Sequence, residues 1–89
     1  MPAKHLFVYG KVQGVFYRKS AKHIAEKLKL IGWIKNRPDG SVESIIQGEE
    51  FAILKFLEWC RMGPAGASVE KIEIKEINDF DNLKQFSIK

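Results

Sequence analysis

The sequence predicts an α+β fold in which an antiparallel sheet carries two helices on one face. Two segments, 19–31 and 49–62, repeat apolar residues at the spacing of a helix. Shorter runs before, between and after them have the apolar patterns of strands. A Pro-Asp-Gly turn at 38–40 joins two of these runs, which predicts a hairpin between the helices.

The composition is that of one globular domain, which we expect to span 1–89. Hydrophobic residues make up 45% of the chain and charged residues 29%, a balance that separates it from disordered chains. Its apolar stretches are far shorter than a membrane span, and its start lacks a signal-peptide pattern. We therefore expect a cytoplasmic protein with no membrane partner. The single cysteine, Cys60, excludes an internal disulfide, and its apolar helical neighbours predict a buried, unreactive thiol.

The net charge of +4 favours encounters with anions. The lysines are scattered along the chain, so most of them are expected on solvated faces. Charge alone does not separate a nucleic acid from a small phosphorylated metabolite as the partner.

The first strand and the first helix are predicted at 4–10 and 19–31. Residues 6–9 are all apolar, so the strand offers apolar side chains to both faces, as a central strand does. The buried stripe of the helix consists of Tyr17, Ala21, Ile24, Ala25, Leu28 and Ile31. Gly32 is expected to end the helix as its C-cap.

The hairpin strands follow at 33–37 and 41–47. Gly48 separates them from the second helix, 49–62, whose first turn carries two glutamates that suit the helix dipole. The buried stripe of this helix consists of Ile53, Phe56, Leu57 and Cys60. A Gly-Pro pair at 63–64 ends it.

The remaining residues predict a strand at 69–77, a polar connection over 78–82 and a short final strand that contains Phe86 and Ile88. The order is therefore βαββαβ plus a short terminal strand. Right-handed crossovers place the first and third strands side by side, with the first one central. This is the ferredoxin-like α/β sandwich, which hosts many activities and does not by itself assign one.

The stretch 10–18 leads from the first strand into the first helix and has the features of an anion site. Gly10 and Gly14 let the backbone bend so that successive N–H groups point into one space. The start of the helix adds free N–H groups and the positive end of the helix dipole. Arg18 adds a charge and a planar fork of donors that suits phosphate oxygens. The other interpretation is an ordinary strand-to-helix turn with a surface arginine.

Asn36 is the second candidate, because asparagine is depleted in strands. One interpretation is that Asn36 ends its strand and supports the turn at 38–40. The other is that its amide points toward the anion loop and orients a water or a substrate oxygen, since an amide both donates and accepts hydrogen bonds.

No side chain offers an obvious general acid or base. His5 and His23 have no carboxylate or cysteine partner at ligand spacing, so we expect a polar strand-end residue, an exposed helix residue and no metal site. Glu43 and Glu73 are interpreted as exposed strand residues, and Asp39 as part of its turn. No serine or cysteine has the setting of an activated nucleophile.

At 10–18, Gly-Lys-Val-Gln-Gly-Val-Phe-Tyr-Arg, the chain resembles the acylphosphatase family, whose first signature is G-x-V-Q-G-V-x-F-R. The stretch 32–42, closed by Gly48, is similar to the second signature, G-W-V-x-N-x-x-x-G-x-V followed by a glycine. The stretch 63–69 is similar to a third, weaker segment. The departures from the family pattern are Tyr17, Ile34 and Ser44.

The resemblance implies an enzyme that hydrolyses acyl phosphates, which are carboxyl–phosphate anhydrides, to a carboxylate and inorganic phosphate. Carried over by position, Arg18 binds the phosphoryl oxygens and Asn36 positions the attacking water. The substrate-binding backbone loop comprises Gln13, Gly14, Val15, Phe16, Tyr17 and Arg18. No metal or organic cofactor is implied, and we expect a monomer without a nucleic-acid partner.

The residues present fit this reaction. The leaving group is a carboxylate whose conjugate acid has a pKa of about 4, so it leaves without being protonated. A largely dissociative phosphoryl transition state also asks little of the nucleophile. Positioning and charge stabilisation then suffice, and the lack of an acid or base favours this reaction over hydrolysis of a phosphate monoester.

Two other functions stay open. One is a non-catalytic ferredoxin-like module that binds phosphorylated metabolites or single-stranded RNA. Such RNA-binding proteins expose aromatic residues on their central strands, whereas the aromatic pair at 16–17 lies in the loop after the first strand. The other is a relative that keeps the site but only senses an acyl or carbamoyl phosphate.

Overall fold

The computed structural model describes residues 1–78 and 84–89. In this part of the chain the elements are β1 (Ala3–Lys11), α1 (Tyr17–Lys27), β2 (Ile31–Asn36), β3 (Val42–Gln47), α2 (Glu50–Met62), β4 (Ser68–Ile77) and β5 (Phe86–Ile88). The predicted order of strands and helices is confirmed. Of the polar connection expected over 78–82, all but Asn78 lies outside the described residues.

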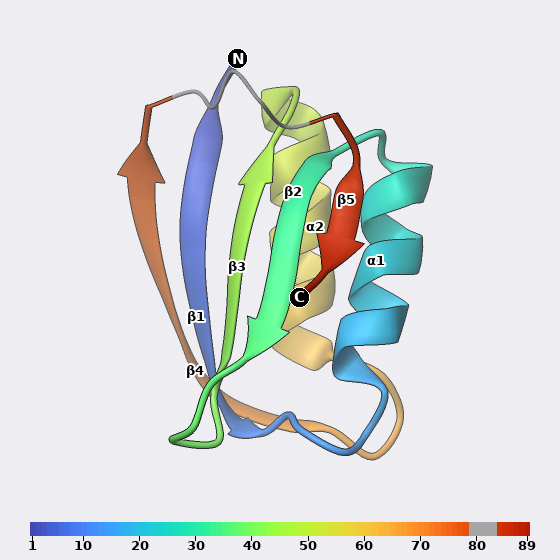
Figure 1. The fold of residues 1–89 in the computed structure, drawn as a ribbon, viewed down its shortest axis with the longest axis vertical. Coiled ribbons are helices and arrows are strands. Elements are labelled where there is room, and N and C mark those ends of the chain that lie inside the picture. Colours follow the sequence, from blue (N-terminus) through green and yellow to red (C-terminus); the bar gives the residue numbers. More distant parts are fainter. Residues whose placement is uncertain (79–83) are drawn as a thin grey trace.

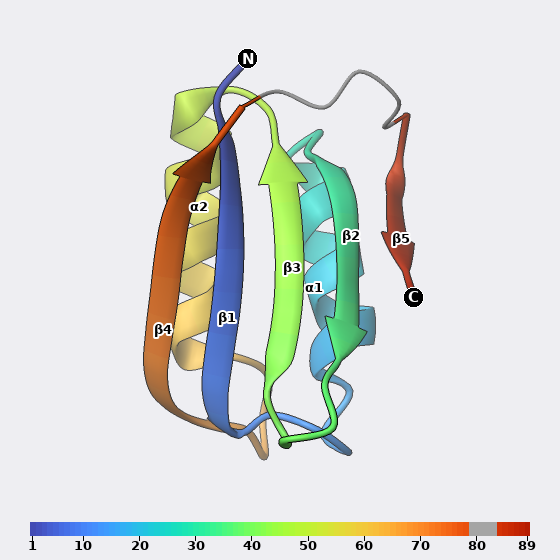
Figure 2. The same cartoon turned by 60° about the vertical axis from the view of Figure 1, so that its left-hand side comes forward.

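The strands form one sheet in the order β4-β1-β3-β2-β5, as Figure 2 shows. β1 pairs antiparallel with both β3 and β4, and β2 pairs antiparallel with β3. The predicted neighbours, the first and third strands, are therefore adjacent and internal. β5 pairs parallel with β2, so the short terminal strand turns a four-stranded antiparallel sheet into a mixed one.

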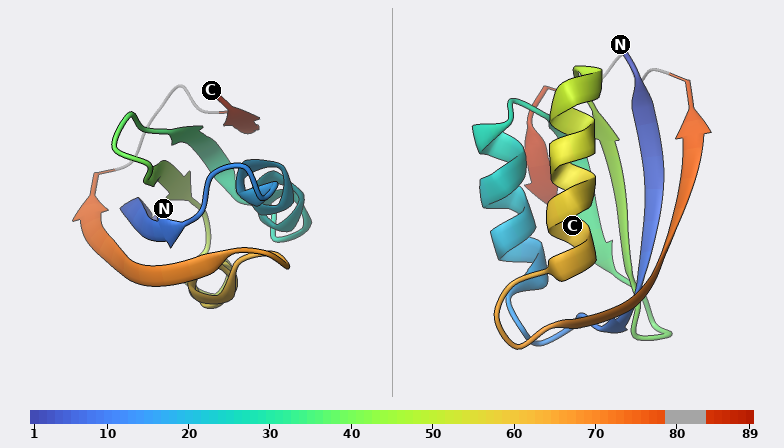
Figure 3. Two further views of the ribbon diagram at one scale, coloured as in Figure 1. Left: turned by 90° about the horizontal axis from the view of Figure 1, so that it is seen from below. Right: turned by 180° about the vertical axis from the view of Figure 1, so that it is seen from behind.

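Both helices cover the same face of the sheet, which confirms the predicted ferredoxin-like sandwich (Figure 3, right). The core lies between them and the sheet, because alternate residues of β1 and β3 point to that side. Its largest fully buried side chains are Tyr17, Phe56, Phe86, Leu6, Ile34, Ile46 and Ile53. Neither α1 nor α2 is long and apolar enough to cross a membrane.

The end of α1 differs from the prediction. The helix stops at Lys27, and Lys29 takes the left-handed conformation, with φ 60°, that a C-terminal glycine usually adopts. Gly32, the predicted C-cap, lies within β2 instead. Its φ is 144°, and a Cβ there would lie 1.8 Å from the backbone oxygen of Ile45 on β3. Glycine is therefore required by the close approach of two strands and not by the end of the helix.

The second helix agrees with its predicted stripe. Ile53, Phe56, Leu57 and Cys60 are all buried, and Gly63 follows the last helical residue as the C-cap. Burial raises the pKa of the Cys60 thiol to about 12, which confirms the expected buried thiol.

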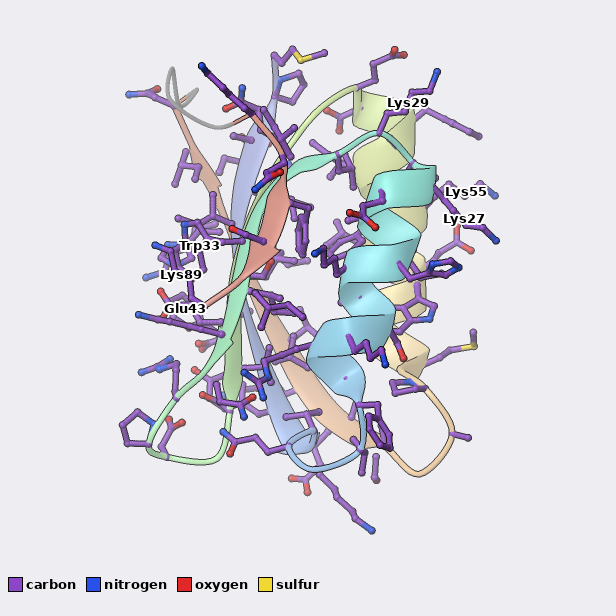
Figure 4. All side chains as sticks on the ribbon, turned by 45° about the vertical axis from the view of Figure 1, so that its right-hand side comes forward. Lys27, Lys29, Trp33, Glu43, Lys55 and Lys89 are labelled. Carbon is purple, nitrogen blue, oxygen red and sulfur yellow. The ribbon has the colours of Figure 1, made fainter. Side chains whose placement is uncertain are left out.

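The side of the sheet away from the helices corrects two predictions. His5 lies within β1 and not at its end, and its Nε2 is 2.7 Å from Oε2 of Glu43 on β3. Glu43 is half-buried, and its Oε1 also lies 3.8 Å from Nζ of Lys35. His5 therefore has a carboxylate partner, and Glu43 is not an exposed strand residue. Figure 4 shows Glu43 on this side of the sheet together with Trp33.

Candidate active site

A pocket of about 270 Å³ lies where the start of α1 meets the ends of β2 and β5. Figure 1 shows both strands running toward this end of the helix. The pocket is lined by Val12, Gly14, Phe16, Tyr17, Arg18, Lys19, Asn36 and Ile88. The fold thus brings Arg18 and Asn36, the two predicted catalytic residues, into one pocket.

The loop between β1 and α1 has the backbone shape of an anion-binding site. Gly14 has φ 74° and Phe16 has φ 61°, and left-handed residues of this kind in a loop can turn successive backbone N–H groups toward one space. The first N–H groups of α1, from Tyr17 onward, have no acceptor within the helix. Its first turn carries no acidic residue, which leaves the positive end of the helix dipole uncompensated.

Arg18 is one of the two charged residues that line this pocket, the other being Lys19. Arg18 is the second residue of α1 and is half-buried. Within residues 1–78 and 84–89, no hydrogen bond or ion pair engages its guanidinium. Its five donors are therefore available to an anion held by the loop.

The side chain of Asn36 has a buried oxygen whose lack of a partner is not explained by packing. Asn36 is the last residue of β2 and shares the helix-facing side of that strand with Ile34. Its Oδ1 is buried and is the only such side-chain atom without a hydrogen-bond partner in the described part of the chain. Because buried polar atoms are nearly always paired, an unpaired one in a pocket points to a partner that comes from outside the protein.

The turn at 38–40 does not use Asn36. Its side-chain hydrogen bonds come from Asp39, whose Oδ1 accepts from the backbone N–H and the hydroxyl of Ser41. These bonds also hold the pKa of the Asp39 carboxyl below its usual value. Asn36 thus ends its strand, as the first interpretation expects, but within the described residues its side chain makes no hydrogen bond to the turn, and it lines the pocket.

Gln13 has a role that the sequence did not reveal. Its side-chain Nε2 donates to the backbone oxygens of Arg37, at 2.8 Å, and Ser41, at 2.9 Å. This amide ties the anion loop to the hairpin that carries Asn36, and so joins the two halves of the pocket. Because the contact spans twenty-four residues of sequence, no local pattern predicts it.

Six residues were expected to form the binding loop, and four of them line the pocket: Gly14, Phe16, Tyr17 and Arg18. Gln13 and Val15 belong to the loop but do not line the pocket. Val12, Lys19 and Ile88 line it without having been predicted. Lys19 looks like any surface lysine in the sequence, and Ile88 arrives only through the pairing of β5 with β2.

The fold and the pocket together define a small ferredoxin-like protein with a pocket between the start of its first helix and the end of its second strand, lined by Arg18 and Asn36. The chain belongs to the acylphosphatase family, because a model of that family, described as acylphosphatase, matches residues 4–88. It is 50% identical to an acylphosphatase of Pyrobaculum calidifontis, over 89% of this chain and 78% of the relative. It is 45% identical to one of Pyrobaculum arsenaticum, over 97% and 98% of the two chains.

A solved structure supports the same assignment. The crystal structure of acylphosphatase from Bacillus subtilis superposes with a TM-score of 0.96 at 37% identity, and the match covers 100% of this chain and 99% of the other. The chain is therefore an acylphosphatase-family enzyme, and its activity is the hydrolysis of acyl phosphates.

Proposed function

We propose that this pocket splits an acyl phosphate to a carboxylate and inorganic phosphate, with Arg18 holding the phosphoryl group and Asn36 aiming the water. The observation that carries the proposal is that Asn36, whose buried Oδ1 has no hydrogen-bond partner among the described residues, lines the same pocket as Arg18, whose guanidinium has no partner among them either. The Oδ1 of Asn36 can accept a hydrogen bond from a water. The guanidinium of Arg18 can bind the anionic phosphoryl group.

Arg18 and the loop stabilise the charge of the phosphoryl group. In this proposal the backbone N–H groups of the loop, residues 13–18, donate to the phosphoryl oxygens, and the guanidinium adds a formal charge beside them. Because the transition state spreads charge over the equatorial oxygens, fixed donors around that space bind it without reorganising.

Asn36 positions the nucleophile. Its Oδ1 accepts a hydrogen bond from a water, and the buried setting leaves that oxygen no other partner among the described residues. The water oxygen forms a bond to phosphorus as the bond from phosphorus to the acyl oxygen breaks. The acyl oxygen leaves as a carboxylate with the bonding electron pair, and the proton lost by the water passes to the phosphate product or to solvent.

The pocket needs no general acid for this step. The leaving carboxylate is a weak base, with a conjugate acid of pKa about 4. An alkoxide leaving group would require an acid or a metal. The residues around the pocket therefore suit an anhydride better than a phosphate monoester.

The direct test is phosphate release from an aryl acyl phosphate, measured with and without a chelator of divalent cations. We expect turnover that survives the chelator, in keeping with a site that needs no metal or organic cofactor. A protein that binds oligonucleotides in a salt-dependent way but releases no phosphate would instead be the non-catalytic module. Tight binding of an acyl or carbamoyl phosphate without turnover would identify a sensor.

We also propose that residues 1–89 act as one monomeric domain in the cytoplasm, without a nucleic-acid partner. The sheet runs from β4 to β5 and so includes strands from both ends of the sequence. Sedimentation of the purified chain should give a single species near its mass of 10.2 kDa, and a heavier species at micromolar concentration would exclude the monomer.

A further inference from the structure

Phe16 adopts a backbone conformation that its side chain does not favour. It is the residue before α1, with φ 61° and ψ 26°, in the left-handed region. A bulky residue is rare there, because its Cβ crowds the backbone, and glycine or asparagine would adopt the same shape at less cost. Strain of this kind collects at functional sites, where another requirement holds the residue in place.

Packing does not explain the residue either. Phe16 is 76% exposed, more than any other large hydrophobic residue in the described part of the chain. Among the described residues, the ring of Phe16 contacts no other ring and no cation. Phe51 is also exposed, but the ammonium of Lys55 lies over its ring. Neither the backbone nor the core therefore accounts for an aromatic side chain at position 16.

The location of Phe16 suggests why an aromatic side chain occupies this position. The residue lines the pocket that holds Arg18 and Asn36. Ile88 of β5 lines the same pocket and is 40% exposed. Two apolar side chains thus stand beside the groups that bind the phosphoryl end of the substrate, and the substrate has one further part, its acyl group.

We propose that Phe16, with Ile88, forms the acyl-binding side of the pocket and selects acyl phosphates with an aromatic or large apolar acyl group. This inference rests on the proposed function, because it assigns the remaining part of the same substrate. The flat ring of Phe16 offers a stacking surface that is already exposed, and an apolar acyl group covers it. The phosphoryl group stays with the loop and Arg18.

Lys19 supplies the competing possibility. It also lines the pocket, and its charge would favour an acyl group that carries a second anion. The helix start and Arg18 already concentrate positive potential on the phosphoryl end. Phe16 and Ile88 are uncharged and add nothing to that potential, so their presence in the pocket favours an apolar acyl group over an anionic one.

The test compares kcat/KM for benzoyl phosphate, acetyl phosphate and succinyl phosphate, whose acyl groups are aromatic, small and anionic. We expect benzoyl phosphate to be preferred over acetyl phosphate by roughly tenfold or more, the discrimination that an apolar pocket achieves. In Phe16→Gly, which keeps the left-handed backbone and removes the ring, this ratio should fall roughly tenfold, whatever happens to either rate alone.

Two further variants sharpen the comparison. Phe16→Trp keeps an aromatic surface and should retain the preference. Phe51→Ala removes another exposed aromatic residue, on α2 and outside the pocket, and should leave the ratio as it is in the parent.

An unchanged ratio in Phe16→Gly would overturn this inference, and so would a parent that prefers succinyl phosphate or does not discriminate. In each of these cases the parent still turns over an acyl phosphate, so the proposed function stands. A parent that hydrolyses none of the three substrates removes the proposed function and this inference together.

Discussion

At the scale of single residues, the site depends on two side chains left without partners. The guanidinium of Arg18 has no ion pair within the described residues, and the Oδ1 of Asn36 has no donor there. Leaving a buried oxygen unpaired costs about 1–3 kcal/mol, which a purely structural position would not retain. We therefore propose that the two groups are arranged for a substrate and a water.

Replacing Arg18 tests the first of these groups. Arg18→Ala should lower kcat/KM for an acyl phosphate at least ~10²-fold, as the loss of a preorganised donor to a developing charge does. It should also weaken inhibition by inorganic phosphate. Arg18→Lys, which keeps the charge and loses the planar fork, is the matched variant and should recover only part of the rate. Activity equal to the parent in folded Arg18→Ala would remove this residue from the mechanism.

Tyr17 is one of the departures from the family pattern, which more commonly has phenylalanine at this position. The hydrogen bond of its hydroxyl accounts for the difference. Its hydroxyl donates to the backbone oxygen of Cys60 at 2.8 Å and so links the start of α1 to the end of α2. Tyr17→Phe should lower the free energy of unfolding by about 1–2 kcal/mol, because the carbonyl loses a buried donor.

Urea titration of the Tyr17→Phe variant measures this loss. Tyr9→Phe is the control, since its hydroxyl bonds to Glu73 on the exposed side of the sheet and its removal should cost little. Equal effects of the two substitutions would contradict the role assigned to Tyr17.

At the scale of elements, the loop between β1 and α1 and the hairpin of β2 and β3 must keep a fixed spacing. The side chain of Gln13 provides this spacing through its two bonds to the hairpin backbone. Gln13 does not line the pocket, so we propose that it positions the loop and Asn36 and does not contact the substrate.

Gln13→Met, which keeps the length of the side chain and removes its amide, should lower kcat by roughly tenfold while KM changes little, because misplacement of the water affects the chemical step. The accompanying loss of stability should be about 1 kcal/mol per bond removed, since both carbonyls retain other donors. Steady-state kinetics below the unfolding transition separate the two effects. A loss of stability with unchanged kcat would make the amide purely structural.

Local patterns predicted most of the elements but not the contacts between distant ones. The buried stripe of α2 follows from helical spacing, and the hairpin from the Pro-Asp-Gly turn. Gly32 was misassigned because a glycine after a helical stretch fits a C-cap as well as it fits a close strand crossing. The pair His5–Glu43 and the contribution of Ile88 to the pocket arise from strand pairing across long separations, which a single sequence does not encode locally.

At the scale of the whole molecule, we expect the core that joins the two helices to lose stability at alkaline pH. Burial raises the pKa of Cys60 from 9.0 to about 12, and burial also raises that of Tyr17 strongly. As the pH rises above 9, the unfolded chain therefore releases the thiol proton before the folded chain does. The stability due to the neutral thiol is complete below pH 9 and is lost as the pH rises toward 12.

The free energy of unfolding should therefore fall above pH 9, by at most roughly 1.4 kcal/mol per pH unit for each such group. Denaturant titrations between pH 7 and about 11 measure this slope. Cys60→Ala removes the thiol and should give a shallower decline, although its stability at pH 7 is lower because of the cavity. An identical slope in the parent and in this variant would contradict the assignment to Cys60.

We propose that the fold as a whole holds the amide of Asn36 where it aims a water at a phosphoryl group bound by Arg18. Asn36→Ala, assayed for turnover of an acyl phosphate and for inhibition by inorganic phosphate, tests this proposal most directly. If Asn36 aims the water, kcat falls by roughly 10²-fold, while the inhibition constant of phosphate stays close to that of the parent. If turnover is unchanged, or if phosphate inhibition is lost together with turnover, Asn36 does not position the nucleophile.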